Sequence, residues 1–84
     1  MRVPIVIYTV PNCPQCSMTA RMMTRYGIIY DQVDLTQHPE VAEAFVKKGY
    51  ATAPIVVTDT KTWSGFRLDK IKSLANFLFE SKIV

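Results

Sequence analysis

The fold is decided by one stretch near the start of the chain, Ile5-Val6-Ile7-Tyr8-Thr9-Val10-Pro11-Asn12-Cys13-Pro14-Gln15-Cys16. The β-branched run from Val3 to Tyr8 is typical of a strand that is buried on both faces. Residues 9–12 then predict a turn, and Pro14 fits the first turn of a helix, where its missing N–H is not needed. A strand that leads into Cys-x-x-Cys at the start of a helix indicates a cysteine pair with redox chemistry.

The rest of the chain alternates between helical and strand patterns. The first helix runs from Pro14 to Gly27, a residue type that commonly ends helices, and a second strand covers 28–35. A second helix begins at Pro39 and ends at 47–49. Strands at 54–58 and 62–66, joined by a turn at 59–61, predict an antiparallel hairpin. The last helix carries apolar residues at intervals of three and four, namely Leu68, Ile71, Leu74, Ala75 and Leu78.

This order, βαβαββα, predicts one α/β domain over residues 1–84. The first strand–helix–strand unit requires a right-handed crossover between parallel strands, and the hairpin adds two more strands. We therefore expect a four-stranded mixed sheet with three helices on its faces. Such a sheet places the cysteines at the carboxyl edge of the first strand, where clefts and reactive groups gather.

The composition fits a packed globular domain and excludes several other classes. Of the 84 residues, 49% are apolar and 20% are charged, and the net charge of +3 is too small and scattered to predict a nucleic-acid partner. The first apolar run is far shorter than the roughly 18 residues that would span a bilayer. Because no targeting signal is visible either, we expect a cytoplasmic protein without a membrane span.

Cys13 and Cys16 are the two cysteines of the chain, too few for a disulfide-stapled scaffold or a zinc site of four cysteines. Their spacing in the first helical turn brings the sulfurs within reach of each other, so the pair can alternate between dithiol and disulfide. Cys13, at the exposed helix start, is favoured as the thiolate and is the predicted nucleophile. Cys16, further into the helix and more shielded, is the predicted resolving thiol, which breaks the mixed disulfide.

Two other interpretations of the cysteine pair involve no redox catalysis: a structural disulfide, and a zinc site completed by His38 and carboxylates. The usual four-ligand spacings of zinc are absent, so we predict no metal. His38 lies directly before Pro39 and is predicted to be the polar N-cap of the second helix. Beyond that cap, an apolar face at helical spacing is formed by Val41, Ala42, Phe45 and Val46.

Three motifs spread over nearly the whole chain carry a resemblance. They are Tyr8-Thr9-Val10-Pro11-Asn12-Cys13-Pro14-Gln15-Cys16, Ala53-Pro54-Ile55-Val56-Val57 and Trp63-Ser64-Gly65-Phe66-Arg67. In these motifs the chain resembles the NrdH-redoxin family, which comprises glutaredoxin-like electron donors of class Ib ribonucleotide reductase. The third motif distinguishes this family from other glutaredoxin-like chains.

The resemblance implies a thioredoxin fold of the glutaredoxin type and the function of a small dithiol–disulfide oxidoreductase. It implies that Pro54 follows a cis peptide bond and faces the cysteines, so that the adjacent backbone can pair with an extended partner segment. The predicted motif and partner-binding residues are Pro14, Gln15, Ala53, Pro54, Trp63, Ser64, Gly65, Phe66 and Arg67. At least one of the two aromatic residues in this set is expected in the core.

The resemblance also implies the partners. Electrons are expected to pass from NADPH through a separate flavoprotein, thioredoxin reductase, to this chain and on to the large subunit of ribonucleotide reductase. We expect no cofactor bound to the chain itself, since it contains no G-x-G-x-x-G motif for a dinucleotide. We expect a monomer that binds neither nucleic acid nor a membrane.

Alternative functions are a glutathione-dependent glutaredoxin, a general protein disulfide reductase, and a non-enzymatic binding module on the thioredoxin fold. Glutaredoxins that use glutathione carry a Gly-Gly pair at the last helix, whereas here bulky Phe66 follows a single glycine and crowds that site. Three residues depart from the family's common pattern: Val10 replaces a lysine, Leu68 replaces a proline, and Pro14 is more typical of glutaredoxins.

Overall fold

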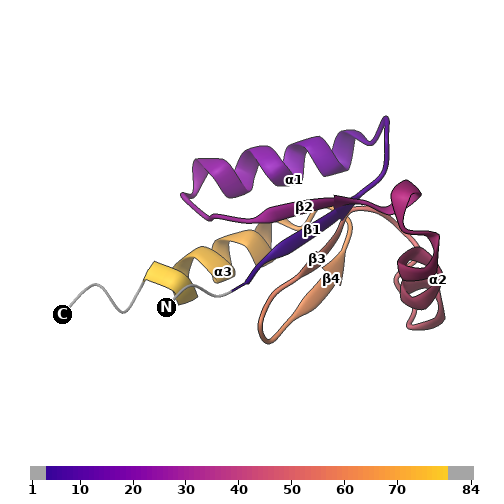
Figure 1. Cartoon of the computed structure of the whole chain (residues 1–84). Helices are drawn as coiled ribbons and strands as arrows, with labels where there is room; N and C mark the ends of the chain where they lie inside the picture. The colour runs from indigo at the N-terminus through magenta and orange to yellow at the C-terminus, as the bar shows by residue number, and fades with distance from the viewer. Residues whose placement is uncertain (1–3, 80–84) are drawn as a thin grey trace.

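The computed structural model describes residues 4–79 and has four strands with helices on both sides of the sheet (Figure 1). In chain order the elements are β1 (Val6–Thr9), α1 (Pro14–Arg25), β2 (Asp31–Asp34), the short 3-10 helix η1 (Leu35–Gln37), α2 (Pro39–Lys47), β3 (Ile55–Val57), β4 (Thr62–Ser64) and α3 (Leu68–Phe79). The predicted order of helices and strands is confirmed, with η1 as an addition that the sequence pattern did not indicate.

The sheet is mixed, with the strand order β2-β1-β3-β4. β1 pairs in parallel with β2, which makes α1 the crossover connection. β3 pairs antiparallel with β1, and β4 antiparallel with β3, as predicted for the hairpin. The carboxyl end of β1 therefore lies at the sheet edge where α1 begins, which is where the cysteine motif was expected.

The first two strands are shorter than predicted. β1 begins at Val6; Val3 lies outside the described residues, and Pro4 has no N–H to give to a ladder. β2 begins only at Asp31, because the N–H of Ile28 bonds back to the Met23 carbonyl at 2.9 Å and completes the end of α1. At its other end, the Asp34 carboxylate accepts the N–H of Thr36 at 2.9 Å, which starts η1 instead of extending the strand.

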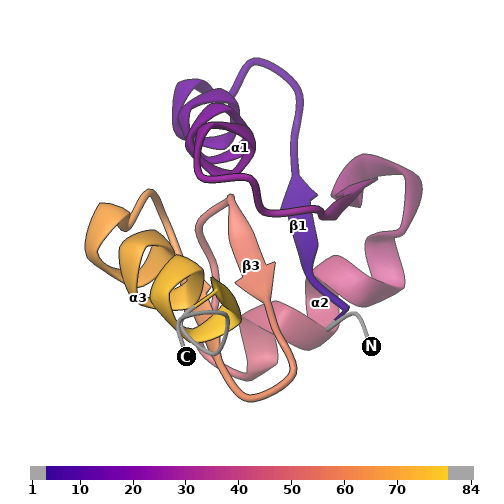
Figure 2. The same cartoon turned by 90° about the vertical axis from the view of Figure 1, so that its left-hand side faces the viewer.

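One face of the sheet carries the hydrophobic core. Ile7 and Val56 lie opposite each other on β1 and β3, and both are fully buried. They pack in one cluster with Met23 of α1 and Ile71 of α3. Figure 2 shows α1 and α3 on the same side of the sheet, with α2 on the other. Because side chains alternate along a strand, the residues between these core positions face α2.

The face toward α2 is packed differently. The ring of Tyr8 on β1 meets Phe45 of α2 edge-on at 4.9 Å, and Tyr50 extends the contact with ring centroids 6.3 Å from Phe45. No residue of α2 is buried, and Val46 is 57% exposed. The apolar face predicted for this helix therefore covers the sheet only in part. Within residues 4–79, no helix has the length and apolar content needed to cross a bilayer.

Candidate redox site

Cys13 and Cys16 form a disulfide at the start of α1, with their Cα atoms 5.2 Å apart. Asn12 precedes them with φ +57°, a left-handed conformation that asparagine tolerates better than most residues, and it turns the chain from β1 into the helix. Cys13 is the N-cap and Pro14 begins the helix. Cys16 is 6% exposed whereas Cys13 is half-buried, so the predicted difference in shielding is confirmed.

The helix start presents a hydrogen-bond donor to the Cys13 sulfur. The N–H of Cys16 points at Cys13 Sγ with an N···S distance of 3.2 Å. The first N–H groups of a helix have no partner within it, and together with the helix dipole they favour negative charge at this end. Once the disulfide is reduced, these groups stabilise a thiolate on Cys13, which is the nucleophilic form of the side chain.

A second segment meets the disulfide from the start of β3. The Ala53–Pro54 peptide bond is cis, as the family resemblance implied, and Pro54 is buried. The Ala53 carbonyl oxygen lies 3.9 Å from Cys13 Sγ, so Ala53 is adjacent to the predicted nucleophile. The structure thus brings together residues that are about forty positions apart in the sequence.

The third segment is the loop between β4 and α3. β4 ends at Ser64 instead of the predicted residue 66, because Gly65 has φ +84° and leaves the strand. The Gly65 N–H donates to the Pro54 carbonyl at 2.8 Å, and Ser64 Oγ donates to the Thr52 carbonyl. The Phe66 N–H donates to Gln15 Oε1 at 3.0 Å. The loop is therefore tied both to the segment at Pro54 and to the cysteine motif.

The side chain of Arg67 turns away from this network toward α3. Its Nε and Nη2 atoms donate to the two carboxylate oxygens of Asp69 at 3.1 and 2.9 Å. These hydrogen bonds lower the pKa of Asp69 below its ordinary value, and the same partner raises the pKa of Arg67. Both side chains are largely exposed, so solvent screens the pair.

Trp63 does not lie on the predicted partner surface, and this expectation is corrected. Its side chain is 5% exposed and packs in the core cluster beneath α1 and α3. Its Nε1 atom is buried without a hydrogen-bond partner. Because the residues of β4 alternate between faces, Trp63 faces the core next to Val56. Trp63 meets the expectation that at least one of the two aromatic residues lies in the core, while Phe66 is only partly buried there.

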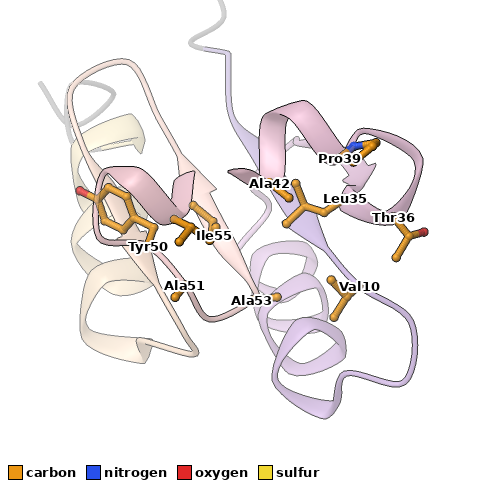
Figure 3. Close-up of a pocket in the computed structure, with 10 residues that line it drawn as sticks. Val10, Leu35, Thr36, Pro39, Ala42, Tyr50, Ala51, Ala53 and Ile55 are labelled. Atoms are coloured by element: carbon orange, nitrogen blue, oxygen red, sulfur yellow. The ribbon is translucent and has the colours of Figure 1, made fainter. Parts of the chain in front are cut away.

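An apolar groove that was not predicted from the sequence includes Ala53, the neighbour of Cys13, in its lining (Figure 3). The groove has a volume of about 370 Å³ and lies between α2, η1 and the starts of the loops after β1 and before β3. Its lining residues are Val10, Leu35, Thr36, Pro39, Ala42, Val46, Tyr50, Ala51, Ala53 and Ile55. Val10 and Ala53, both labelled in Figure 3, contribute to this lining from the loop after β1 and the segment before β3. The one signal of this groove in the sequence was the apolar face of α2, because Ala42 and Val46 of that face line the groove.

A second, more polar hollow of about 560 Å³ lies on another side of the cysteines. Thr9, Asn12, Ser17 and Gln32 contribute its polar groups. Thr9 is 6% exposed, and its hydroxyl is 3.4 Å from the Val33 carbonyl oxygen, to which it donates. Both cysteines thus line the polar hollow, whereas the apolar groove reaches the site through Ala53, whose carbonyl lies near Cys13.

His38 occupies the predicted N-cap position, but its side chain makes no capping hydrogen bond. Its backbone carbonyl instead accepts the N–H groups of Val41 and Ala42, and its Nδ1 atom lies 4.0 Å from Glu40. The prediction of a side-chain cap is therefore wrong. Across residues 4–79, no three His, Cys, Asp or Glu side chains gather closely enough to hold a metal ion.

The family model and the similar proteins point to the same family. The sequence model named Glutaredoxin matches residues 5–63. The glutaredoxin-like protein NrdH of Escherichia coli K12 is 39% identical over 70 residues, which cover 83% of this chain and 86% of the relative. NrdH of Lactococcus lactis subsp. lactis is 30% identical over 71 residues, covering 84% and 99%.

A solved structure supports the same relationship. The NrdH-redoxin from Escherichia coli superimposes with a TM-score of 0.81 at 39% identity, covering 88% of this chain and 95% of that one. That protein is described as glutaredoxin-like with a thioredoxin-like activity profile. The thioredoxin-like fold of the glutaredoxin type expected from the sequence is confirmed.

Proposed function

The chain belongs to the glutaredoxin family and, within it, to the NrdH-redoxins, and on this basis we propose that it carries electrons from thioredoxin reductase to a class Ib ribonucleotide reductase. At the coarser level it is a thiol-disulfide oxidoreductase. One observation carries the proposed mechanism: the sulfur of Cys13 accepts an N–H at the helix start, while Cys16 is buried behind it. The two cysteines therefore have different roles.

In the proposed cycle, the thiolate of Cys13 attacks one sulfur of the acceptor disulfide. The acceptor S–S bond breaks, its second sulfur leaves as a thiolate that takes up a proton, and Cys13 is joined to the acceptor in a mixed disulfide. Cys16 then loses its proton and attacks the Cys13 sulfur. The acceptor departs as a dithiol that has gained two electrons and two protons, and the Cys13–Cys16 disulfide is restored.

Re-reduction uses the same exchange in the opposite direction. A dithiol on thioredoxin reductase supplies two electrons, which that flavoprotein receives from NADPH, so this chain needs no bound cofactor. The proposed cycle belongs in the cytoplasm, where such reductants keep dithiols reduced. The direction of electron transfer depends on small differences in reduction potential, because about 30 mV corresponds to 1.4 kcal/mol in a two-electron exchange.

The surroundings of the disulfide favour a protein acceptor. The Ala53 backbone lies beside Cys13, where an extended segment carrying the target disulfide can align. The groove next to it is lined mainly by apolar side chains and has room for an apolar residue near the target cysteine. The loop with Phe66 is hydrogen-bonded to Pro54 through the Gly65 N–H and to Gln15 through the Phe66 N–H.

NADPH oxidation in a coupled assay tests the proposal. The oxidised protein should be reduced by thioredoxin reductase with NADPH and should then support turnover of a class Ib ribonucleotide reductase large subunit without another reductant. The parallel reaction supplies glutathione and glutathione reductase. Turnover with glutathione alone would replace the proposal with a glutathione-dependent glutaredoxin.

The Cys13→Ser variant tests the non-enzymatic alternative. We expect this variant to lose disulfide reduction with every acceptor, because it lacks the attacking thiolate. Disulfide reduction that survives the substitution would contradict the thiol mechanism. Binding of the ribonucleotide reductase subunit that is independent of the redox state, together with no reduction by the wild type, would indicate a binding module.

A further inference from the structure

Gln15 makes a contact that the proposed exchange of electrons does not itself require. Gln15 lies between the two cysteines in the sequence. Its side chain reaches the loop after β4, where Oε1 accepts the Phe66 N–H at 3.0 Å. The two residues are 51 positions apart. Because the bond joins the helix start to the backbone of a distant segment, it restrains the position of the loop relative to α1.

The geometry around Gly65 is adapted to this bond. Gly65 has φ +84°, and a Cβ atom built there would lie 3.5 Å from Gln15 Oε1, in van der Waals contact. The positive φ of Gly65, which glycine adopts without strain, turns the chain so that the next N–H meets the amide oxygen of Gln15. On its other side, the Gly65 N–H is held by the Pro54 carbonyl at 2.8 Å.

These bonds join three separate segments into one frame around the disulfide. Gln15 belongs to the cysteine motif, Pro54 to the segment that approaches Cys13, and Phe66 to the loop before α3. Ser64 adds a bond from its hydroxyl to the carbonyl of Thr52. Without the Gln15 side chain, the loop would keep its hydrogen bond to the segment at Pro54 but lose its hydrogen bond to the helix that carries the cysteines.

We propose that Gln15 is a positioning residue that fixes the 64–67 loop against the start of α1, so that the loop and the dithiol present one preformed surface to a protein disulfide. Gln15 does not touch the reacting sulfurs in this role. A preformed surface lowers the cost of ordering the loop when a large partner binds. A small disulfide that contacts only the sulfurs gains nothing from it. This inference rests on the proposed function only in that the acceptor is a protein.

The proposal predicts a difference between large and small acceptors. Gln15→Leu keeps a similar side-chain volume and removes the acceptor oxygen, whereas Gln15→Glu keeps an oxygen that can accept the Phe66 N–H. The second-order rate constant of the reduced protein is measured with insulin and with bis(2-hydroxyethyl) disulfide. For Gln15→Leu we expect about a fivefold loss with insulin, equivalent to roughly 1 kcal/mol for one hydrogen bond, and no loss with the small disulfide.

Two further measurements separate positioning from general damage. Hydrogen exchange of the Phe66 amide should become faster in Gln15→Leu and stay slow in Gln15→Glu, which should also keep the wild-type rate with insulin. Gln37→Leu, on exposed η1 and outside the site, is the matched control and should behave as wild type.

Each departure from this pattern overturns the inference. Unchanged Phe66 exchange in Gln15→Leu would mean that the bond does not hold the loop in solution. Equal losses with insulin and the small disulfide would place the effect of Gln15 on the thiol chemistry. An unchanged rate with insulin, or a Gln15→Glu variant that loses rate with insulin as much as Gln15→Leu but keeps its rate with the small disulfide, would show that the bond has no function in docking. Because insulin is reduced independently of thioredoxin reductase, these results do not depend on whether that enzyme is the physiological donor.

Discussion

The two faces of the sheet are built for different purposes. On one face, Ile7, Val56, Met23 and Ile71 are fully buried between the strands, α1 and α3. On the other, α2 buries none of its own residues and leaves an apolar groove of about 370 Å³ that ends beside the disulfide. The comparison shows that the main hydrophobic cluster lies on the face away from the groove, while the groove face keeps apolar surface available near Ala53 and the cysteines.

The largest effect on stability is expected on the packed face. Ile71→Ala removes a fully buried side chain from the contact of α3 with the sheet, and we expect it to lower the free energy of unfolding by about 2–5 kcal/mol. Ile29→Ala is the control, since Ile29 is 63% exposed, and it should change stability by less than about 0.5 kcal/mol. Urea denaturation of both variants measures the difference, and equal losses would contradict the burial of Ile71 as the source of its contribution to stability.

A smaller and different effect is expected in the groove. Val46→Lys places a charge in the groove at the end of α2, where the helix dipole tolerates a cation. We expect a change in stability within about 0.5 kcal/mol but a fivefold or greater loss of rate with insulin, equivalent to about 1 kcal/mol or more. The rate with bis(2-hydroxyethyl) disulfide should be unchanged.

Ala44→Lys is the matched control for the groove, because it adds the same charge to an exposed position of α2 that does not line the groove. It should keep the wild-type rate with both acceptors. If Ala44→Lys slowed insulin reduction as much as Val46→Lys, the loss would come from net charge and not from occupation of the groove.

The smallest effect is expected from the Arg67–Asp69 pair. Arg67 lowers the pKa of the Asp69 carboxyl in the folded state, so the contribution of the pair to stability is complete above the unfolded pKa and is lost as pH falls through the lower folded value. Asp69→Asn should therefore be slightly less stable than wild type at pH 7, by an amount near the error of a thermal melt. Thermal melts from pH 7 to pH 2 should converge in acid; a gap that widens in acid would contradict the assignment.

Local signals in the sequence predicted most of the fold. Pro14 and Gly27 delimit α1, and Pro39 and Gly49 delimit α2, because proline and glycine act on the backbone of their own neighbourhood. The bounds of β2 were predicted less well, since they depend on hydrogen bonds at Ile28 and Asp34 that compete with the ladder. Periodicity cannot reveal such competition.

The sequence predicted the chemistry of the candidate site better than it predicted the residues around the cysteines. Cys13 and Cys16 follow from spacing and position, and the family resemblance supplied Pro54 and the loop. The groove and the bond from Gln15 to Phe66 could not be predicted, because they join segments that are far apart in the sequence and meet only in the folded chain. Which of Trp63 and Phe66 lies in the core could not be predicted for the same reason: the strand face of Trp63 became clear only from the register with Val56.

Trapping of the mixed disulfide tests the unequal roles of the two cysteines most directly. Reduced Cys16→Ser and Cys13→Ser variants are mixed with an excess of bis(2-hydroxyethyl) disulfide, and the adducts are followed by mass spectrometry. Cys16→Ser should form an adduct on Cys13 rapidly and retain it, whereas Cys13→Ser should react through the buried Cys16 at least tenfold more slowly, because its thiol is shielded and lies inside the helix. Adduct formation at equal rates, or faster on Cys16, would contradict the assignment of Cys13 as the nucleophile.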